Sequence, residues 1–95
     1  MPSLNYRTQS SDAISADYID MPATAQIVLV NNTSGASIGS PTALAGSGKG
    51  TVMVPIDFSI PGGDYFLRAQ DASTKAFIAQ TVKFYIGDAS KGQPS

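Results

Sequence analysis

The residues with the clearest chemical signature are the letters GSGKGT at residues 46–51, which combine three glycines with a lysine and two hydroxyl side chains. A glycine-rich turn of this kind can wrap its backbone N–H groups around a phosphate, while the lysine and a hydroxyl contact phosphate oxygens and a metal ion. Nucleotide binding is therefore the first chemistry to test against the surrounding sequence.

The flanks of this stretch do not fit a phosphate loop. Such a loop follows a buried strand and leads directly into a helix, whose N-terminus faces the anion. Here Ala43 occupies the position of the first glycine, and residues 52–58 (VMVPIDF) alternate in hydrophobicity as a strand does, with Pro55 among them. We interpret the stretch as a flexible hairpin loop with Lys49 at its solvated tip, and we predict no nucleotide and no other cofactor.

Catalytic side chains are scarce. The chain contains no cysteine, no histidine and no glutamate, so serine and aspartate have no base to activate a nucleophile, and we predict that the protein is not an enzyme. The aspartates suggest calcium as a candidate, because three are spaced by seven residues and three gather near the N-terminus. These two sets are Asp57, Asp64 and Asp71, and Asp12, Asp17 and Asp20. Aspartates in such positions more often cap turns, so we predict no metal site.

Length and charge narrow the class of protein. Ninety-five residues make one small domain, and a net charge of −1 with scattered charges offers no basic stripe to a nucleic acid. No apolar run approaches the roughly 18 residues of a membrane helix, and the first 20 residues lack the order of a signal peptide, so we expect neither membrane insertion nor a signal. The letters NNTS at 31–34 contain two overlapping glycosylation sequons, with a polar turn as the alternative reading.

Short alternating runs of Val, Ile, Thr, Tyr and Phe predict strands, and no segment has a helical period. We expect strands over 27–30, 51–58, 64–70 and 75–86, and one or two edge strands within 36–46, where Pro41 cannot donate to a central ladder. Within 27–30, Ile27 and Leu29 point one way and Val28 and Val30 the other. The predicted core positions on the later strands are Val52, Val54, Ile56, Phe58, Tyr65, Leu67, Ala69, Ile78, Val82, Phe84 and Ile86. The predicted fold class is all-β, an antiparallel β-sandwich of about seven strands.

Four large side chains fall on the faces opposite these core positions: Met53, Phe66, Phe77 and Tyr85. They either belong to the interior through the second sheet, or form an exposed apolar patch that docks a partner.

The letters PGGDYFLRA at 61–69 carry a family resemblance. They resemble the entry to the sixth strand of immunoglobulin-like domains, where a tyrosine lies two residues before a core position. That match implies structural roles for Gly63, Tyr65 and Leu67, with the Tyr65 hydroxyl bonded to the backbone of the preceding turn and Leu67 in place of the usual cysteine.

Residues 23–86 as a whole are similar to the immunoglobulin-like module of fungal cell-wall glucan-assembly and Ser/Thr-rich anchored surface proteins. Similar modules occur on bacterial surfaces and phage virions. The resemblance implies a binding or structural role.

The expected organisation has three parts: an extended N-terminal arm at 1–22, a sandwich at 23–87 and a disordered tail at 88–95. The arm alternates apolar anchors with polar linkers, as a segment that orders on a partner would. Its second half, about Tyr18 to Met21, has an alternative role as the first strand of the sandwich. The candidate partner-binding residues are Leu4, Tyr6, Ile14, Tyr18, Ile19, Phe66, Phe77 and Tyr85.

These observations predict a non-enzymatic structural protein on the exterior of a virion, such as a capsid decoration protein that binds a repeating protein shell. Repetition of the shell would bring copies together, so the expected partners include other copies of this chain. The alternative is a secreted or cell-surface immunoglobulin-like module that binds carbohydrate or protein.

Overall fold

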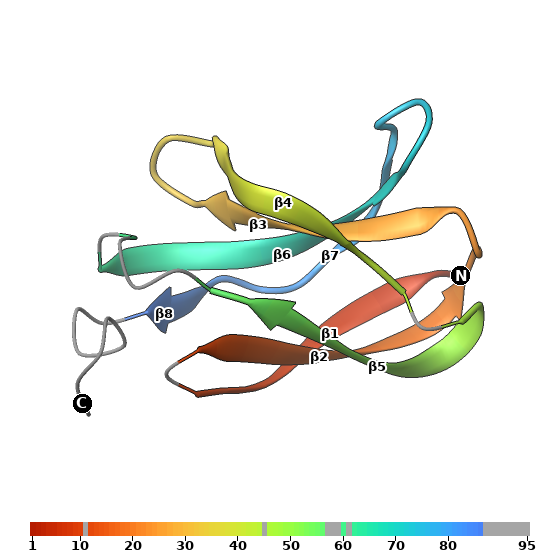
Figure 1. Cartoon of the computed structure of the whole chain (residues 1–95), viewed down its shortest axis with the longest axis horizontal. Coiled ribbons are helices and arrows are strands. Elements are labelled where there is room, and N and C mark those ends of the chain that lie inside the picture. Colours follow the sequence, from red (N-terminus) through yellow and green to blue (C-terminus); the bar gives the residue numbers. More distant parts are fainter. Residues whose placement is uncertain (11, 45, 57–59, 61, 87–95) are drawn as a thin grey trace.

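The computed structural model describes residues 1–10, 12–44, 46–56, 60 and 62–86. These residues form eight strands and no helix, so the described part holds no helix that could cross a bilayer (Figure 1). The strands are β1 (Ser3–Gln9), β2 (Ala13–Met21), β3 (Ala25–Asn31), β4 (Ser37–Ala43), β5 (Gly48–Pro55), β6 (Gly63–Asp71), β7 (Phe77–Gln80) and β8 (Phe84–Ile86).

The strands form two antiparallel sheets. One has the order β1-β2-β5; the other has the order β4-β3-β6-β7, with β8 also paired to β6. In Figure 1 the three-stranded sheet is the lower layer, and β4, β3 and β6 lie above it. The predicted all-β sandwich fold is confirmed.

Period-two alternation decides which side chains lie between the sheets. On β6, Tyr65, Leu67 and Ala69 point inward and are fully buried, and on β5 Val52 and Val54 do the same, all as predicted. Burying a side chain the size of leucine stabilises the fold by about 1.5–3 kcal/mol. The buried core consists of Leu4, Ile14, Ala16, Tyr18, Met21, Ala25, Ile27, Leu29, Val52, Val54, Ile60, Tyr65, Leu67, Ala69, Ala79, Phe84 and Ile86.

The expectation of a separate N-terminal arm is wrong. Residues of this segment form β1 and β2, a hairpin that supplies two of the three strands in its sheet. Leu4, Ile14 and Tyr18 are at most 3% exposed and belong to the core. On β2 the buried residues Ile14, Ala16 and Tyr18 recur with period two, which is the pattern of a strand with one face in the core. The alternative, in which Tyr18 to Met21 form a strand, describes the end of β2.

The edge strand β4 is irregular, as its sequence predicts. Its pairing with β3 shifts between Ile27 and Leu29, and Gly39, with a φ of 73°, and Pro41 lie in the shifted part. A bulge at an edge accommodates the missing N–H of proline and blocks the pairing of another strand.

The C-terminal run also departs from regular alternation. β7 and β8 pair with different parts of β6, and the link between them buries Thr81 while leaving Val82 78% exposed. The prediction that Val82 lies in the core is therefore wrong, whereas Phe84 and Ile86 are buried as predicted. Asp57, Phe58, Pro61 and the tail at 88–95 lie outside the described residues.

The turns after β3 and β6 share one hydrogen-bonding pattern. Asn31 Oδ1 accepts hydrogen bonds from the N–H groups two and three residues later, at 2.8 and 3.1 Å, and Asp71 Oδ1 does so at 2.8 and 3.0 Å. Each turn then has a residue with positive φ, Gly35 at 76° and Lys75 at 64°. Because Asn31 pairs with Tyr65 and Ala25 with Asp71, the two hairpins are related by a local two-fold axis between β3 and β6.

Candidate functional site

The glycine-rich stretch forms part of a strand. From Gly48 onward it belongs to β5, which pairs with β2 through Gly48↔Met21, Gly50↔Tyr18 and Thr51↔Asp17. β4 and β5 lie in different sheets, so the segment joins the two layers and the predicted hairpin loop is wrong. A strand also stands where a phosphate loop requires a helix.

Gly50 has a packing role. A Cβ atom added there would lie 2.8 Å from the Tyr18 hydroxyl oxygen and 3.0 Å from its Cζ atom. The Tyr18 hydroxyl donates a 2.9 Å hydrogen bond to the Gly46 carbonyl oxygen. The ring of Tyr18, which is 2% exposed, therefore covers the glycine of the neighbouring strand.

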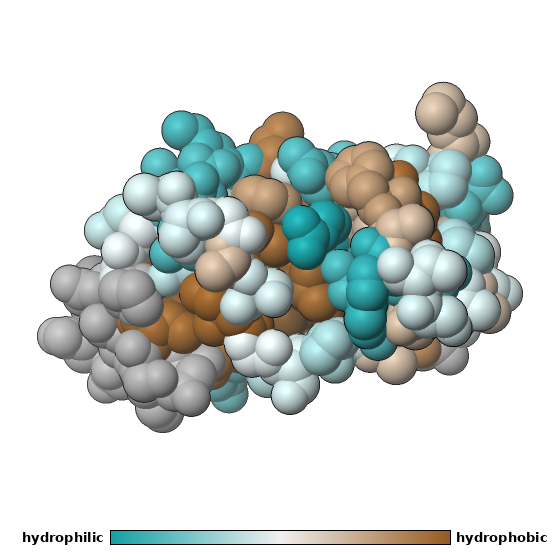
Figure 2. All heavy atoms as spheres, turned by 90° about the horizontal axis from the view of Figure 1, so that it is seen from above, coloured by the Kyte–Doolittle hydropathy of each residue, from teal (hydrophilic) through white to brown (hydrophobic). Residues whose placement is uncertain are grey.

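The main candidate site is a hollow of about 530 Å³ on the outer face of the five-stranded sheet. The hairpin formed by β3 and β4 contributes Val28, Ser37, Gly39 and Pro41. The hairpin formed by β6 and β7 contributes Arg68, Gln70, Lys75, Phe77 and Gln80. Figure 2 looks onto this side of the molecule and shows apolar surface in its middle, bordered and interrupted by strongly hydrophilic side chains. The hollow therefore offers an apolar floor and polar groups to one ligand.

A line of polar side chains crosses the hollow. Arg68 Nη2 donates to Gln70 Oε1 at 3.3 Å, Gln70 Nε2 donates to Gln26 Oε1 at 3.5 Å, and Lys75 Nζ donates to the same oxygen at 3.3 Å. Gln70 is only 6% exposed, so its amide is held in place by the sheet. These contacts are long for N–H···O hydrogen bonds, so a ligand atom at 2.9 Å would compete with them favourably.

Three aromatic side chains lie along the same outer face. Phe66 precedes the inward-facing Leu67, Tyr85 stands opposite Asp64 at the start of β6, and Phe77 stands opposite Gln70 near its end. Phe77 and Tyr85 are 61% and 62% exposed. Six residues of strand separate the ends of this row, about 20 Å at 3.3 Å per residue. An extended ligand therefore has room to contact more than one ring.

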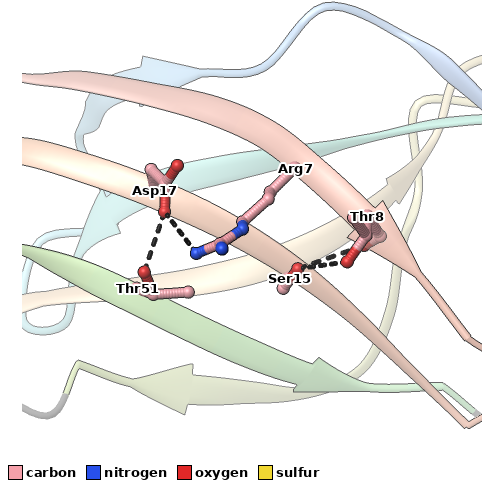
Figure 3. Close-up of polar contacts among 5 residues, drawn as sticks. All are labelled: Arg7, Thr8, Ser15, Asp17 and Thr51. Atoms are coloured by element: carbon pink, nitrogen blue, oxygen red, sulfur yellow. Dashed lines mark hydrogen bonds and ion pairs between the residues drawn. The ribbon is translucent and has the colours of Figure 1, made fainter.

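The outer face of the three-stranded sheet holds a smaller hollow, of about 330 Å³. Figure 3 shows Arg7 and Thr51 pointing toward Asp17 from the strands on either side. Asp17 Oδ1 accepts a 2.8 Å hydrogen bond from Thr51 Oγ1 and lies 3.6 Å from Arg7 Nη1, and the Thr8 and Ser15 hydroxyls are 2.8 Å apart. These polar groups bond to one another, so this face has less capacity to bind a polar ligand.

The structure sorts the predicted partner-binding residues into three groups. Leu4, Ile14 and Tyr18 are buried in the core, so the prediction that they contact a partner is wrong. Tyr6 is half-buried and its ring stacks on Phe84 with centroids 4.5 Å apart. The remaining residues are accessible on the two outer faces, Ile19 on the three-stranded sheet and Phe66, Phe77 and Tyr85 on the five-stranded sheet.

The residues that sequence reasoning did not select are Gln26, Arg68, Gln70 and Lys75. Arg68 and Gln70 follow Phe66 at period two on β6, which is a usable sign that they share its face. Gln26 and Lys75 come from another strand and a turn, and only the sheet pairing brings them there.

Asp71 caps a turn, as aspartates in such positions were expected to do. Hydrogen bonds from the backbone N–H groups of Thr74 and Ser73 lower the pKa of its carboxyl group from the ordinary value. Among the described residues no three acidic side chains gather where they could hold a metal ion, and Asp57 lies outside them.

Neither a protein-family model nor a curated protein matches this chain.

Proposed function

We propose that this chain is a non-enzymatic module that binds carbohydrate on the outer face of its five-stranded sheet. The observation that carries the proposal is the hollow in which the exposed ring of Phe77 lies beside Arg68 and Gln70. This proposal takes up the alternative from the sequence, a secreted or cell-surface module that binds carbohydrate.

The chemistry of these side chains matches that of a sugar. A pyranose ring has apolar C–H faces that pack on an aromatic ring, and a rim of hydroxyl groups that pair with planar amide and guanidinium groups. The sheet holds these groups on rigid strands, which lowers the entropy lost when a ligand is bound. The row of aromatic side chains suits an oligosaccharide better than a single sugar.

The strand order supports an immunoglobulin-like type for this module. In the usual lettering, β1, β2 and β5 take the places of strands A, B and E, while β4, β3, β6 and the β7–β8 pair take those of C′, C, F and G. Tyr65 then lies at the start of strand F, two residues before the buried Leu67.

Binding to a panel of neutral and acidic polysaccharides, measured by affinity electrophoresis and calorimetry, tests the function. Phe77→Ala should weaken binding by about five- to tenfold, the loss of roughly 1 kcal/mol of ring contact. Met53→Ala removes an equally exposed side chain on the other sheet and should leave binding unchanged. The proposal fails if no polysaccharide binds, or if the two variants behave alike.

A second candidate is the structural role on the exterior of a virion, as a decoration protein bound to a repeating shell. The favouring observation is that Ile19 and Met53, on the outer face of the three-stranded sheet, are 51% and 58% exposed. Since Leu4, Ile14 and Tyr18 are buried, this contact would use a sheet face and no arm. Cosedimentation of the chain with particles should then be lost in an Ile19→Ser, Met53→Ser double variant and kept in Phe77→Ala.

A further inference from the structure

We propose that the ligand of the hollow is an acidic carbohydrate, a uronate-containing oligosaccharide whose carboxylate is held by Arg68. This inference rests on the proposed function and specifies the class of sugar.

The charge of the hollow carries the inference. Arg68 and Lys75 are both among its described lining residues, and none of those lining residues is acidic. The whole chain has a net charge of −1, so this cationic hollow contrasts with the rest of the molecule. Two positive groups beside an apolar floor favour an anionic ligand over a neutral one.

The position of Arg68 suits a carboxylate. It lies in the middle of β6, between Val28 on β3 and Gln80 on β7, and all three residues line the hollow. Among the described residues the one hydrogen bond of its guanidinium group is the contact of Nη2 with Gln70 Oε1, at 3.3 Å. Guanidinium has five N–H donors in a planar fork, which leaves a pair for two parallel hydrogen bonds to a carboxylate.

The second cation is held at the far end of the same polar line. Lys75 Nζ donates to Gln26 Oε1 at 3.3 Å and to the Ala72 carbonyl oxygen at 3.1 Å, which fixes the ammonium group above the turn. Since an ammonium is a compact point charge without fork geometry, Lys75 would attract the anion while Arg68 orients it.

An acidic peptide is the competing anionic ligand, and the neighbouring edges argue against it. Peptides commonly bind sheets by adding a strand to an exposed edge. Both edge strands of the sheet, β4 and β7, line this hollow. Pro41 and the shifted register near Gly39 interrupt the ladder of β4, and β7 is only four residues long, so neither edge offers an added strand a long ladder. The ligand therefore has to be recognised by side chains on the open face, which is how sugar rings are bound.

The experiment compares polygalacturonate and alginate with their methyl esters, which keep the shape of each polymer and remove its charge. With the intact chain at low salt, calorimetry should give tighter binding to the acids by about tenfold, and the difference should shrink as salt is added. Arg68→Gln should remove most of the preference, leaving the part due to the charge of Lys75, and keep the weaker binding to the esters. Arg68→Lys should restore only part of it, because the fork is lost.

The control variant is Arg7→Gln, which removes an exposed arginine from the opposite sheet and should leave the preference intact. Melting temperatures of the three variants close to that of the native chain will show that each one folds. Equal binding of acids and esters would overturn the acidic ligand and leave the proposed function standing. No binding of either form would overturn both. Binding of polyglutamate alone, lost in Arg68→Gln, would replace the sugar by an acidic peptide.

Discussion

Gly50→Ala is the substitution that best separates the packing role of the glycine-rich stretch from a phosphate-binding role. The new methyl group would lie 2.8 Å from the Tyr18 hydroxyl oxygen and 3.0 Å from Cζ, whereas unstrained contacts of this kind begin near 3.4 Å. The ring of Tyr18 cannot move freely, because it is 2% exposed and its hydroxyl is bonded to the Gly46 carbonyl oxygen.

The expected effect is a loss of stability. Overpacking of this kind costs about 1–3 kcal/mol, and the smaller entropy of an unfolded chain with alanine offsets about 0.5 kcal/mol of it. The free energy of unfolding should fall by about 1–2 kcal/mol, which is a decrease in melting temperature of roughly 5–10 °C for a domain of this size. Urea titration followed by tyrosine fluorescence measures the free energy directly.

Gly46→Ala is the matched control, because an added Cβ there meets no atom within 4 Å. It should be neutral or slightly stabilising. A double-mutant cycle adds a second check, because Tyr18→Phe removes the hydroxyl that the new methyl group would meet. The loss of unfolding free energy caused by Tyr18→Phe should therefore be smaller in the Gly50→Ala variant than in the native chain. Equal stabilities of the two alanine variants would refute the packing role of Gly50.

Three further predictions concern buried or capping polar groups. Thr81→Val removes the hydroxyl oxygen that accepts a 3.0 Å hydrogen bond from the buried Leu67 N–H group, so unfolding experiments should show a loss of about 1–3 kcal/mol, whereas Thr81→Ser should keep that bond. Tyr65→Phe should cost a similar amount because Tyr65 is fully buried, and Tyr85→Phe, with its ring 62% exposed, should cost nothing measurable. Asp71 has a lowered pKa in the folded state, so its stabilisation is complete above the ordinary value near 4 and is lost as pH falls through the lower folded value. Stability measured between pH 5 and pH 2.5 should therefore fall less in Asp71→Asn than in the native chain, and an unchanged slope would contradict the capping role.

The fold class and the central strands could be predicted because their alternation is uninterrupted. On β6 every second residue from Tyr65 to Ala69 is apolar and buried, and β5 behaves likewise at Val52 and Val54. The sequence pattern fails to show β1 as a strand because its alternation is short: only Leu4 and Tyr6 are apolar, and both precede the shift in pairing between Tyr6 and Thr8. The residues of β1 beyond Tyr6 are all polar, so no apolar residue continues the pattern through the bulge.

A break in the alternation also explains why the prediction for Val82 is wrong. The chain leaves the regular path after Gln80, and the Thr81 hydroxyl replaces a backbone partner of β6 at Leu67. The alternation therefore resumes in a new phase at Phe84, and Val82 faces solvent. A polar residue that serves as a backbone partner cannot be recognised by its hydropathy.

Part of the candidate site could be predicted and part could not. Phe66, Phe77 and Tyr85 were placed on the side away from the core by alternation alone, and Phe77 and Tyr85 are exposed there. Arg68 and Gln70 have the same alternation, but outward polar residues on a strand are so common that their pattern indicates only a solvated face.

The local two-fold relation between the hairpins explains why a hollow forms on this face. Equivalent positions lie forty residues apart, as in Asn31 and Asp71, so Val28 corresponds to Arg68. Ser37 corresponds to Phe77 by the same relation, since they pair with Val30 and Gln70 respectively. At these positions the β3–β4 hairpin has small or apolar side chains, whereas the β6–β7 hairpin has a long polar one and an aromatic one. The two hairpins have similar backbones, but the shorter side chains of β3–β4 leave space beside the longer side chains of β6–β7. The groups proposed to bind the ligand, Arg68, Lys75 and Phe77, all belong to the β6–β7 hairpin.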